Sequence, residues 1–231
     1  MSKLISNINK TLDNFKFDKH RKFRKIIYKD LKNNDVEKYD YGNGYFYQSL
    51  DKINLSGLRS SKNRLKEYDI SKYTKNSDIL DIGCNSAFLI CELEQNFNSC
   101  FGIEWNKNLI EIGKKSIKYL DLKKIEIVHG DFLEHNFKDL FFDVIFSFAN
   151  HSTYDKGIIS TEKYFKKCNF LLRDKGKLII ESHHPDYEKK QTFLDLIDSL
   201  RKMYNLKIVL NKTIKTKNYY DDNREFIILQ K

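Results

Sequence analysis

One short stretch, residues 79–89, constrains the fold of this chain more than any other. It reads Ile-Leu-Asp-Ile-Gly-Cys-Asn-Ser-Ala-Phe-Leu, so an apolar strand ending at Ile82 passes through small residues into a helix that begins near Phe88. Such a strand, turn and helix point backbone N–H groups at whatever lies beyond the strand's carboxyl end. Twenty-one residues after Gly83, a second apolar strand ends at Glu104. A carboxylate at this spacing is placed to accept hydrogen bonds from both hydroxyls of a ribose.

The residues of the turn decide between two kinds of nucleotide ligand. A dinucleotide fold requires G-x-G-x-x-G so that the backbone can approach a pyrophosphate. Here only Gly83 is a glycine, and the other turn positions hold Asn85 and Ala87. The sequence therefore favours a nucleoside cofactor without phosphates.

The positive charge of the chain is concentrated in its first third. The formal net charge is +10, and residues 1–75 hold 18 Lys/Arg against 9 Asp/Glu. Two interpretations stay open: a solvated charged helix, or a surface that attracts an anionic substrate such as a phosphorylated sugar, an acidic glycan or RNA. Helix-like apolar spacing runs through residues 3–32 and residues 33–43 read as a loop. We therefore predict a helical, basic N-terminal extension or cap over residues 1–75, ahead of one domain over residues 76–231.

The remaining composition bounds the cell compartment. No apolar run approaches the roughly 20 residues of a membrane span, and the N-terminus has no apolar region of signal-peptide length. The four cysteines show no C-x-x-C spacing and most lie in apolar segments. Buried free thiols in a reducing cytoplasm are the expectation, and no metal site is predicted.

Strands and helices alternate along the rest of the chain. The pattern predicts an α/β fold: a Rossmann-like, seven-stranded, mostly parallel sheet with helices on both faces and a C-terminal antiparallel hairpin. The expected strands lie at residues 77–82, 100–104, 124–129, 142–148, 178–182, 206–210 and 224–229, and the expected helices at residues 86–95, 106–120, 160–172 and 187–204.

The ordered series of motifs resembles that of class I S-adenosylmethionine-dependent methyltransferases. Residues 81–87 are similar to motif I, usually written D-x-G-x-G-x-G, with two of its glycines replaced by Asn85 and Ala87. Asn tolerates a positive φ better than most residues. The later members of the series are Glu104, Asp131, Asp143 in an F-D-x-I segment, and Gly176 before the fifth strand. The resemblance covers about residues 75–231 and implies S-adenosyl-L-methionine as the cofactor.

The resemblance also implies which residues hold the cofactor. Asp131 would reach the adenine amino group with Phe132 packed on the ring, and an arginine of residues 44–64 would clamp the methionine carboxylate. The predicted cofactor-binding residues are Tyr47, Arg59, Asp81, Gly83, Cys84, Asn85, Glu104, Trp105, Asp131, Phe132 and Phe148.

Methyl transfer to a hydroxyl needs a group that removes its proton. The reacting centre of this sheet type lies beyond the carboxyl ends of the first, fourth and fifth strands. The predicted catalytic residues there are His151, favoured as general base, then His183 and Glu181.

The segment after the fourth strand bears on the acceptor. Methyltransferases of base amines commonly carry an Asn/Asp-Pro-Pro-aromatic clamp there, whereas this chain has Phe-Ala-Asn-His at residues 148–151. We therefore expect O-methylation of a sugar, glycan precursor or other polar, perhaps phosphorylated, small molecule. Two alternatives stay open: an RNA methyltransferase that uses the basic N-terminal segment, and a non-catalytic S-adenosylmethionine-binding protein. The sequence makes no prediction of the oligomeric state.

Overall fold

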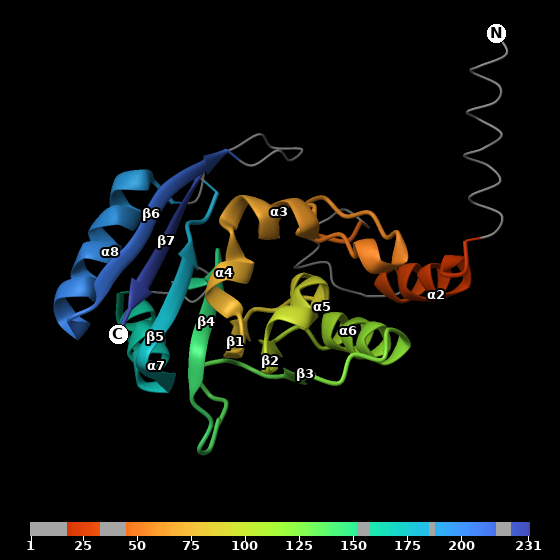
Figure 1. Ribbon diagram of the computed structural model, residues 1–231, viewed down its shortest axis with the longest axis horizontal. Coiled ribbons are helices and arrows are strands. Elements are labelled where there is room, and N and C mark those ends of the chain that lie inside the picture. The colour runs from red at the N-terminus through yellow and green to blue at the C-terminus, as the bar shows by residue number, and fades with distance from the viewer. Residues whose placement is uncertain (1–17, 33–44, 152–157, 185–187, 216–222) are drawn as a thin grey trace, which may run out of the picture.

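The computed structural model describes residues 18–32, 45–151, 158–184, 188–215 and 223–231 (Figure 1). Its centre is a seven-stranded sheet in the order β3-β2-β1-β4-β5-β7-β6. The strands are β1 (Asp78–Ile82), β2 (Ser99–Glu104), β3 (Ile125–His129), β4 (Phe142–Phe148), β5 (Leu172–Glu181), β6 (Lys207–Lys215) and β7 (Asn223–Gln230). This confirms the predicted Rossmann-like architecture, including the C-terminal antiparallel pair.

Strand directions change only at the C-terminal end of the chain. The five strands β1 to β5 pair in parallel, whereas β7 runs antiparallel to both β5 and β6. The first crossovers build outward to β2 and β3, and the chain then returns to place β4 on the other side of β1. Ligands of open α/β sheets bind beyond the carboxyl ends of the strands where the order reverses. In this protein that point lies between β1 and β4.

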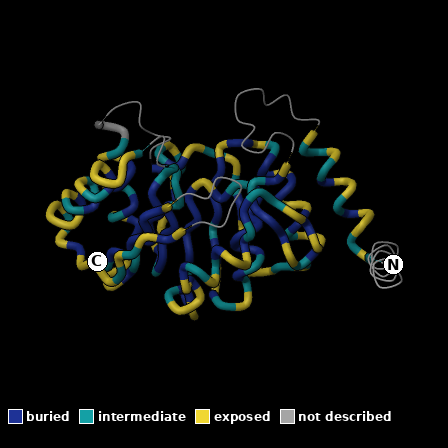
Figure 2. The backbone as a smooth tube through the Cα atoms, turned by 90° about the horizontal axis from the view of Figure 1, so that it is seen from above, coloured by how far each residue is buried: buried dark blue, intermediate teal, exposed yellow. Residues whose placement is uncertain are grey.

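Both faces of the sheet are covered by helices. Alternate residues of each strand point to opposite faces, so Ile79 and Phe146 contribute to one apolar cluster while Leu80 and Ile145 contribute to the other. Buried residues run through the middle of the molecule (Figure 2). The helices are α2 (Arg21–Lys32), α3 (Ser61–Tyr68), α4 (Ile70–Thr74), α5 (Phe88–Leu93), α6 (Lys107–Tyr119), α7 (Ile158–Leu171) and α8 (Lys190–Tyr204), with short 3-10 turns at Asp51–Ile53 and Glu94–Asn96.

The described part of the N-terminal segment shares its core with the sheet domain. Phe23 of α2 stacks on Tyr119 of α6 with ring centroids 4.0 Å apart. The rings of Tyr68 of α3 and Phe226 of β7 have their centroids 4.4 Å apart. Phe46 packs against Phe88 of α5 at 5.2 Å. The described residues before 76 therefore share the core of the sheet domain, although the predicted boundary itself remains a prediction. The expected helix over residues 3–17 and the loop at residues 33–43 lie outside the described residues.

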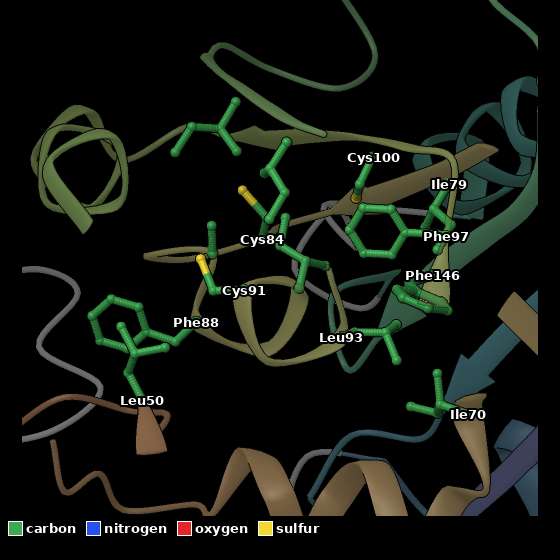
Figure 3. Close-up of a cluster of buried hydrophobic side chains, with 14 of the residues drawn as sticks. Leu50, Ile70, Ile79, Cys84, Phe88, Cys91, Leu93, Phe97, Cys100 and Phe146 are labelled. Carbon is green, nitrogen blue, oxygen red and sulfur yellow. The ribbon is translucent and has the colours of Figure 1, made fainter. Parts of the chain in front are cut away.

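The α5 region shows the packing that the small turn residues permit. Phe88 points toward Leu50, and the side chains of Cys84, Cys91 and Cys100 gather around the helix (Figure 3). All four cysteines are free and buried, as the sequence predicted. Burial in apolar surroundings raises the pKa of the Cys91 thiol, so it stays protonated.

Several element bounds differ from the expectation. Residues 173–177, which lie between the expected helix and the expected fifth strand, belong to β5, where Lys175 has a φ of +63° and the register with β4 shifts between Phe142 and Val144. The irregularity lets the strand begin six residues early. The last helix begins at Lys190 and not at residue 187, and residues 185–187 lie outside the described part.

Candidate cofactor and catalytic site

The turn after β1 keeps the backbone of a glycine-rich loop although two of its glycines are absent. The φ angles of Gly83, Asn85 and Ala87 are +67°, +54° and +59°. All three lie in the left-handed region, at the positions that motif I fills with glycine. Asn adopts this conformation readily, whereas for Ala the left-handed conformation costs roughly 1–2 kcal/mol. The substitutions therefore leave the course of the backbone unchanged.

A glutamine outside the motif helps to hold this turn. Helix α5 has no side-chain cap of its own. The Oε1 atom of Gln48 accepts a hydrogen bond from the backbone N–H of Leu89 at 3.2 Å and satisfies one of the amide groups that a helix start leaves open. Gly57 brings its segment close, because a β-carbon there would lie 2.2 Å from the carbonyl carbon of Gln48. The sequence marked this segment as part of the site but did not predict this contact of its glutamine with α5.

Glu104 lies beside the turn at the end of β2. Its Oε2 accepts a hydrogen bond from the backbone N–H of Asn85 at 3.0 Å, and its Oε1 accepts one from the backbone N–H of Asn106 at 2.9 Å. Burial raises the pKa of Glu104, and these backbone hydrogen bonds oppose the shift. The next residue, Trp105, is 45% exposed. The predicted ribose acid is thus connected to motif I, and an exposed aromatic side chain follows it.

The loop after β3 is fixed by a lysine that the sequence did not single out. Lys167 of α7 donates to the carbonyl oxygens of Leu133 and His135 at 2.8 and 2.7 Å. Its Nζ also lies 5.3 Å from the ring centroid of Phe132, which is buried. Asp131 is exposed, and its Oδ1 accepts the N–H of Leu133 at 2.6 Å. No pattern links a helix lysine to a loop 34 residues earlier, so only the fold reveals this contact.

Asn150, at the end of β4, joins the two central strands. Its Nδ2 donates to the carbonyl oxygen of Ile82, the last residue of β1. Its Oδ1 accepts from the hydroxyls of Ser147 at 3.0 Å and Tyr164 at 2.8 Å. The sequence considered Asn150 only for the absence of a following proline. Its contact with motif I shows that it shapes the site.

Asp81 and Cys84 are buried within the motif. Burial raises the pKa of Asp81 to about 7, an effect that Arg64 opposes and Glu104 reinforces. Burial likewise raises the pKa of Cys84, and its Sγ would lie 2.9 Å from a β-carbon at position 102. Cys84 is therefore a packing residue of the turn, and Asp81 titrates close to neutral pH.

A buried ion cluster ties the segment before β1 to the end of β5. The fully buried carboxylate of Glu181 accepts from Nη1 of Arg59 at 2.7 Å and also pairs with Arg64. Arg59 further donates to the hydroxyls of Tyr47 at 3.2 Å and Tyr68 at 3.1 Å. Burial opposes ionisation of Glu181, but the two arginines hold its pKa well below its usual range.

This cluster bears on two of the sequence-based assignments, which stay predictions. A carboxylate paired with two arginines does not take a proton at neutral pH, which argues against the predicted catalytic role of Glu181. The guanidinium of Arg59 already binds Glu181 and two tyrosines, so it is not a spare clamp for a cofactor carboxylate. Arg64 lies 4.7 Å from the ring centroid of Phe148, which belongs to the predicted cofactor set. Both arginines therefore anchor the cap at the edge of the site.

The two histidine candidates differ in their surroundings. His151 is 1% exposed, and its Nε2 lies 2.9 Å from Oε1 of Glu188. His183 is half-buried, and its Nδ1 accepts the backbone N–H of His184 at 2.8 Å. Burial lowers the pKa of His183, and the nearby Arg224 lowers it further. In the described parts of the chain, no three His, Cys, Asp or Glu side chains form a group that suits a metal ion.

Fold and site together define a class I S-adenosylmethionine-dependent methyltransferase. A family model described as a methyltransferase domain matches residues 73–225, and the chain belongs to this family. This membership agrees with the cofactor that the sequence predicted, S-adenosyl-L-methionine. Across the described ranges, none of the helices has both the length and the apolar character that a membrane crossing requires.

Named proteins with a similar sequence match only part of this chain. A demethylmenaquinone methyltransferase of Bacillus velezensis is 28% identical over 104 residues, which is 43% of this chain and 45% of that protein. The chain thus matches less than half the length of such relatives. The N-methyltransferase NodS of Bradyrhizobium japonicum, solved with S-adenosyl-L-homocysteine, superimposes with a TM-score of 0.58 at 14% identity, covering 89% of this chain and 96% of that one. The [4+2]-cyclase SpnF has a TM-score of 0.60 at 11% identity, covering 74% and 80%.

Proposed function

We propose that this enzyme transfers a methyl group from S-adenosylmethionine to a hydroxyl of a polar small molecule. The observation that carries the proposal is the left-handed backbone at Gly83, Asn85 and Ala87, which keeps the turn open in spite of two lost glycines. A protein that had lost cofactor binding would have no reason to keep three such conformations beside Glu104. This speaks against a protein that no longer binds the cofactor, whereas the alternative of a non-catalytic S-adenosylmethionine-binding protein is decided by whether any acceptor is methylated.

The residues present fit the cofactor. Glu104 would hold the ribose, because Oε2 contacts the turn at Asn85, Oε1 contacts Asn106, and a carboxylate retains acceptor capacity beyond its backbone hydrogen bonds. Phe132 and Trp105 would bound the adenine, and Asp131 would accept from its amino group. Bound S-adenosylmethionine supplies a methyl group that is already activated for transfer. The chain therefore has to align the acceptor and remove its proton.

His151 is the residue that we assign as general base. It directly follows Asn150, whose side chain contacts the last residue of β1, so it lies at the carboxyl ends of the central strands. The missing Pro-Pro pair after Asn150 favours a hydroxyl over a base amine. The positive charge of α2 supports an acceptor that carries an anionic group.

A quinone-type acceptor is the second candidate. The relatives in several Bacillus and Listeria species are named demethylmenaquinone methyltransferases. Their match covers less than half of this chain, so the parts that shape the acceptor pocket are free to differ. RNA is the third acceptor class to be tested, because of the basic segment.

The first experiment measures cofactor binding. We expect S-adenosylhomocysteine to bind the wild-type protein by calorimetry, with Glu104→Ala weakening binding about tenfold or more because charged hydrogen bonds are lost. Glu111→Ala on the exposed face of α6 serves as the matched control. Absence of binding to the wild type, or unchanged binding to Glu104→Ala, would overturn the cofactor assignment.

The second experiment identifies the acceptor class. Methyl-labelled S-adenosylmethionine is incubated with the enzyme and three separate pools: polar metabolites, demethylated quinones and RNA. We expect label in the polar metabolite pool, in an ether that withstands alkali. Label confined to the quinones or to RNA would contradict the proposal.

A further inference from the structure

One ring nitrogen of His151 is unusual among the buried polar atoms. The side chain is almost fully buried between aromatic rings, with Phe165 and Phe193 each 5.8 Å away between ring centroids. Its Nε2 lies 2.9 Å from Glu188, whereas its buried Nδ1 has no hydrogen-bond partner among the described residues. Buried polar atoms in folded proteins are nearly always hydrogen-bonded. An unpaired nitrogen on the residue after Asn150, whose side chain contacts the end of β1, therefore points to a ligand that supplies the missing partner.

Glu188 decides which nitrogen of His151 carries the hydrogen. Its Oε2 accepts the backbone N–H of His183 at 2.8 Å, while its Oε1 contacts His151. Burial opposes ionisation of Glu188, but its hydrogen bonds with the His151 ring and with the backbone N–H of His183 lower its pKa. An ionised carboxylate can only accept hydrogen bonds. Nε2 of His151 must then be the donor, and Nδ1 of the neutral ring keeps a free electron pair.

We propose that Glu188 is a positioning residue that fixes His151 as the Nε2–H tautomer and so makes Nδ1 the nitrogen that accepts the proton of the methyl acceptor. The inference rests on the proposed function, since it names how its general base is oriented. The acceptor O–H bond breaks and its proton goes to Nδ1. The oxygen electron pair forms the new bond to the methyl carbon, and the electrons of the broken carbon–sulfur bond stay on sulfur, which becomes neutral.

The surroundings of the pair are compatible with this role. Glu188 is the acidic side chain in contact with His151. The other charged or titratable groups near the pair are His183 and His184 after β5, and Arg224 of β7. The hydroxyl of Tyr164 of α7 donates to Asn150 and to Ser147 of β4. The arrangement of a base oriented by a carboxylate through its second nitrogen is the general logic of catalytic triads.

The test that does not depend on activity is nuclear magnetic resonance of protein labelled with ¹⁵N-histidine. The His151 ring is assigned by its absence from His151→Gln. We expect a protonated Nε2 and an unprotonated Nδ1 in the wild type at pH 8. In Glu188→Gln we expect this tautomer to lose its dominance, because an amide has one acceptor in place of two and His183 competes for it. A protonated Nδ1 in the wild type, or an unchanged tautomer in Glu188→Gln, would overturn the assignment.

Turnover provides the second readout. With the polar metabolite pool as acceptor, Glu188→Gln should lower kcat at least about tenfold while its dissociation constant for S-adenosylhomocysteine stays within about twofold, since a general base contributes about 10²–10⁴ to the rate. Asp198→Asn on the exposed side of α8 is the matched control for a lost carboxylate. Unchanged kcat in Glu188→Gln contradicts the positioning role. Wild-type protein that labels no pool contradicts the proposed function instead, and the tautomer measurement still decides the role of Glu188.

Discussion

The side-chain nitrogen of Asn150 lies 2.8 Å from the position that a β-carbon on Gly83 would occupy. The two residues belong to different motifs, one after β1 and one after β4, and they meet because these strands are neighbours in the sheet. The glycine is therefore required twice, once for its φ of +67° and once for the space that Asn150 fills.

Gly83→Ala tests this double requirement. We expect a loss of about 2 kcal/mol or more in the free energy of unfolding, because a left-handed alanine costs roughly 1–2 kcal/mol and Asn150 must also move. Affinity for S-adenosylhomocysteine should fall with it. Denaturant titration and calorimetry measure both effects. Gly130→Ala is the control, since a β-carbon there meets nothing closer than 3.7 Å; equal losses in the two variants would contradict the explanation.

Glu181→Gln tests the buried ion cluster. Removing the carboxylate leaves Arg59 and Arg64 without their counter-ion, and breaking a buried pair costs about 3–5 kcal/mol. We expect a loss of that order at pH 7 in chemical denaturation, with Glu126→Gln on the exposed side of β3 as control. Because the folded pKa is lowered, the contribution of Glu181 is present above its ordinary pKa of about 4.3 and is lost as the pH falls toward the folded value. A difference between variant and wild type that persists unchanged at pH 2 would argue against this origin.

Asp81 gives a pH dependence of the opposite sign. Its folded pKa of about 7 lies above its ordinary value of 3.8, so between these values the folded protein binds more protons than the unfolded chain. Asp81 therefore lowers the stability of the wild type progressively as the pH rises from about 4 to about 7, and Asp81→Asn removes this effect. We expect the free energy of unfolding of Asp81→Asn, relative to wild type, to increase between pH 5 and pH 8. A constant difference would show that Asp81 has no raised pKa, and the exposed Asp139→Asn provides the baseline.

Lys167→Met tests the bracing of the loop after β3. The variant keeps an apolar side chain against Phe132 but loses the hydrogen bonds to Leu133 and His135. We expect stability to fall by about 1–2 kcal/mol, because two part-buried carbonyl groups lose a charged donor. Binding of S-adenosylhomocysteine should weaken several-fold if the loop holds the adenine. Lys163→Met on the same helix is the control. Unchanged affinity together with lost stability would separate the loop from the cofactor site.

Much of the fold was predictable because it depends on local patterns. The alternation of short apolar strands with amphipathic helices indicated the α/β sheet. The helix expected at residues 106–120 is present as α6, and Oδ1 of Asn106 caps it by accepting from the backbone N–H groups of Asn108 and Leu109. The turn at residues 83–87 was recognised because its residues are small. The start of β5 was missed, since a bulge at Lys175 looks like a turn when the partner strand is unknown.

The site was predictable only as far as its members are close in sequence. Motif I and Glu104 follow from a fixed spacing, because the βαβ unit that connects them has a standard length. The partners of Arg59 and Lys167 had no such signal, since Glu181 lies 122 residues from Arg59 and the Lys167 contacts depend on how α7 packs. Glu181 looked catalytic because it ends β5 at the site, and only the neighbouring arginines show that its charge is already balanced.

The sequence by itself determined the architecture, the cofactor class and the turn that would hold the cofactor, because these depend on apolar periodicity and on small residues at fixed positions. Three features were decided by the tertiary structure alone. The charge of Glu181 is balanced by two arginines, Nδ1 of His151 has no hydrogen-bond partner among the described residues, and the side chain of Asn150 packs against Gly83. Hydrogen bonds and ion pairs act over about 3 Å. Residues far apart in the chain come that close only when the sheet has placed their strands side by side.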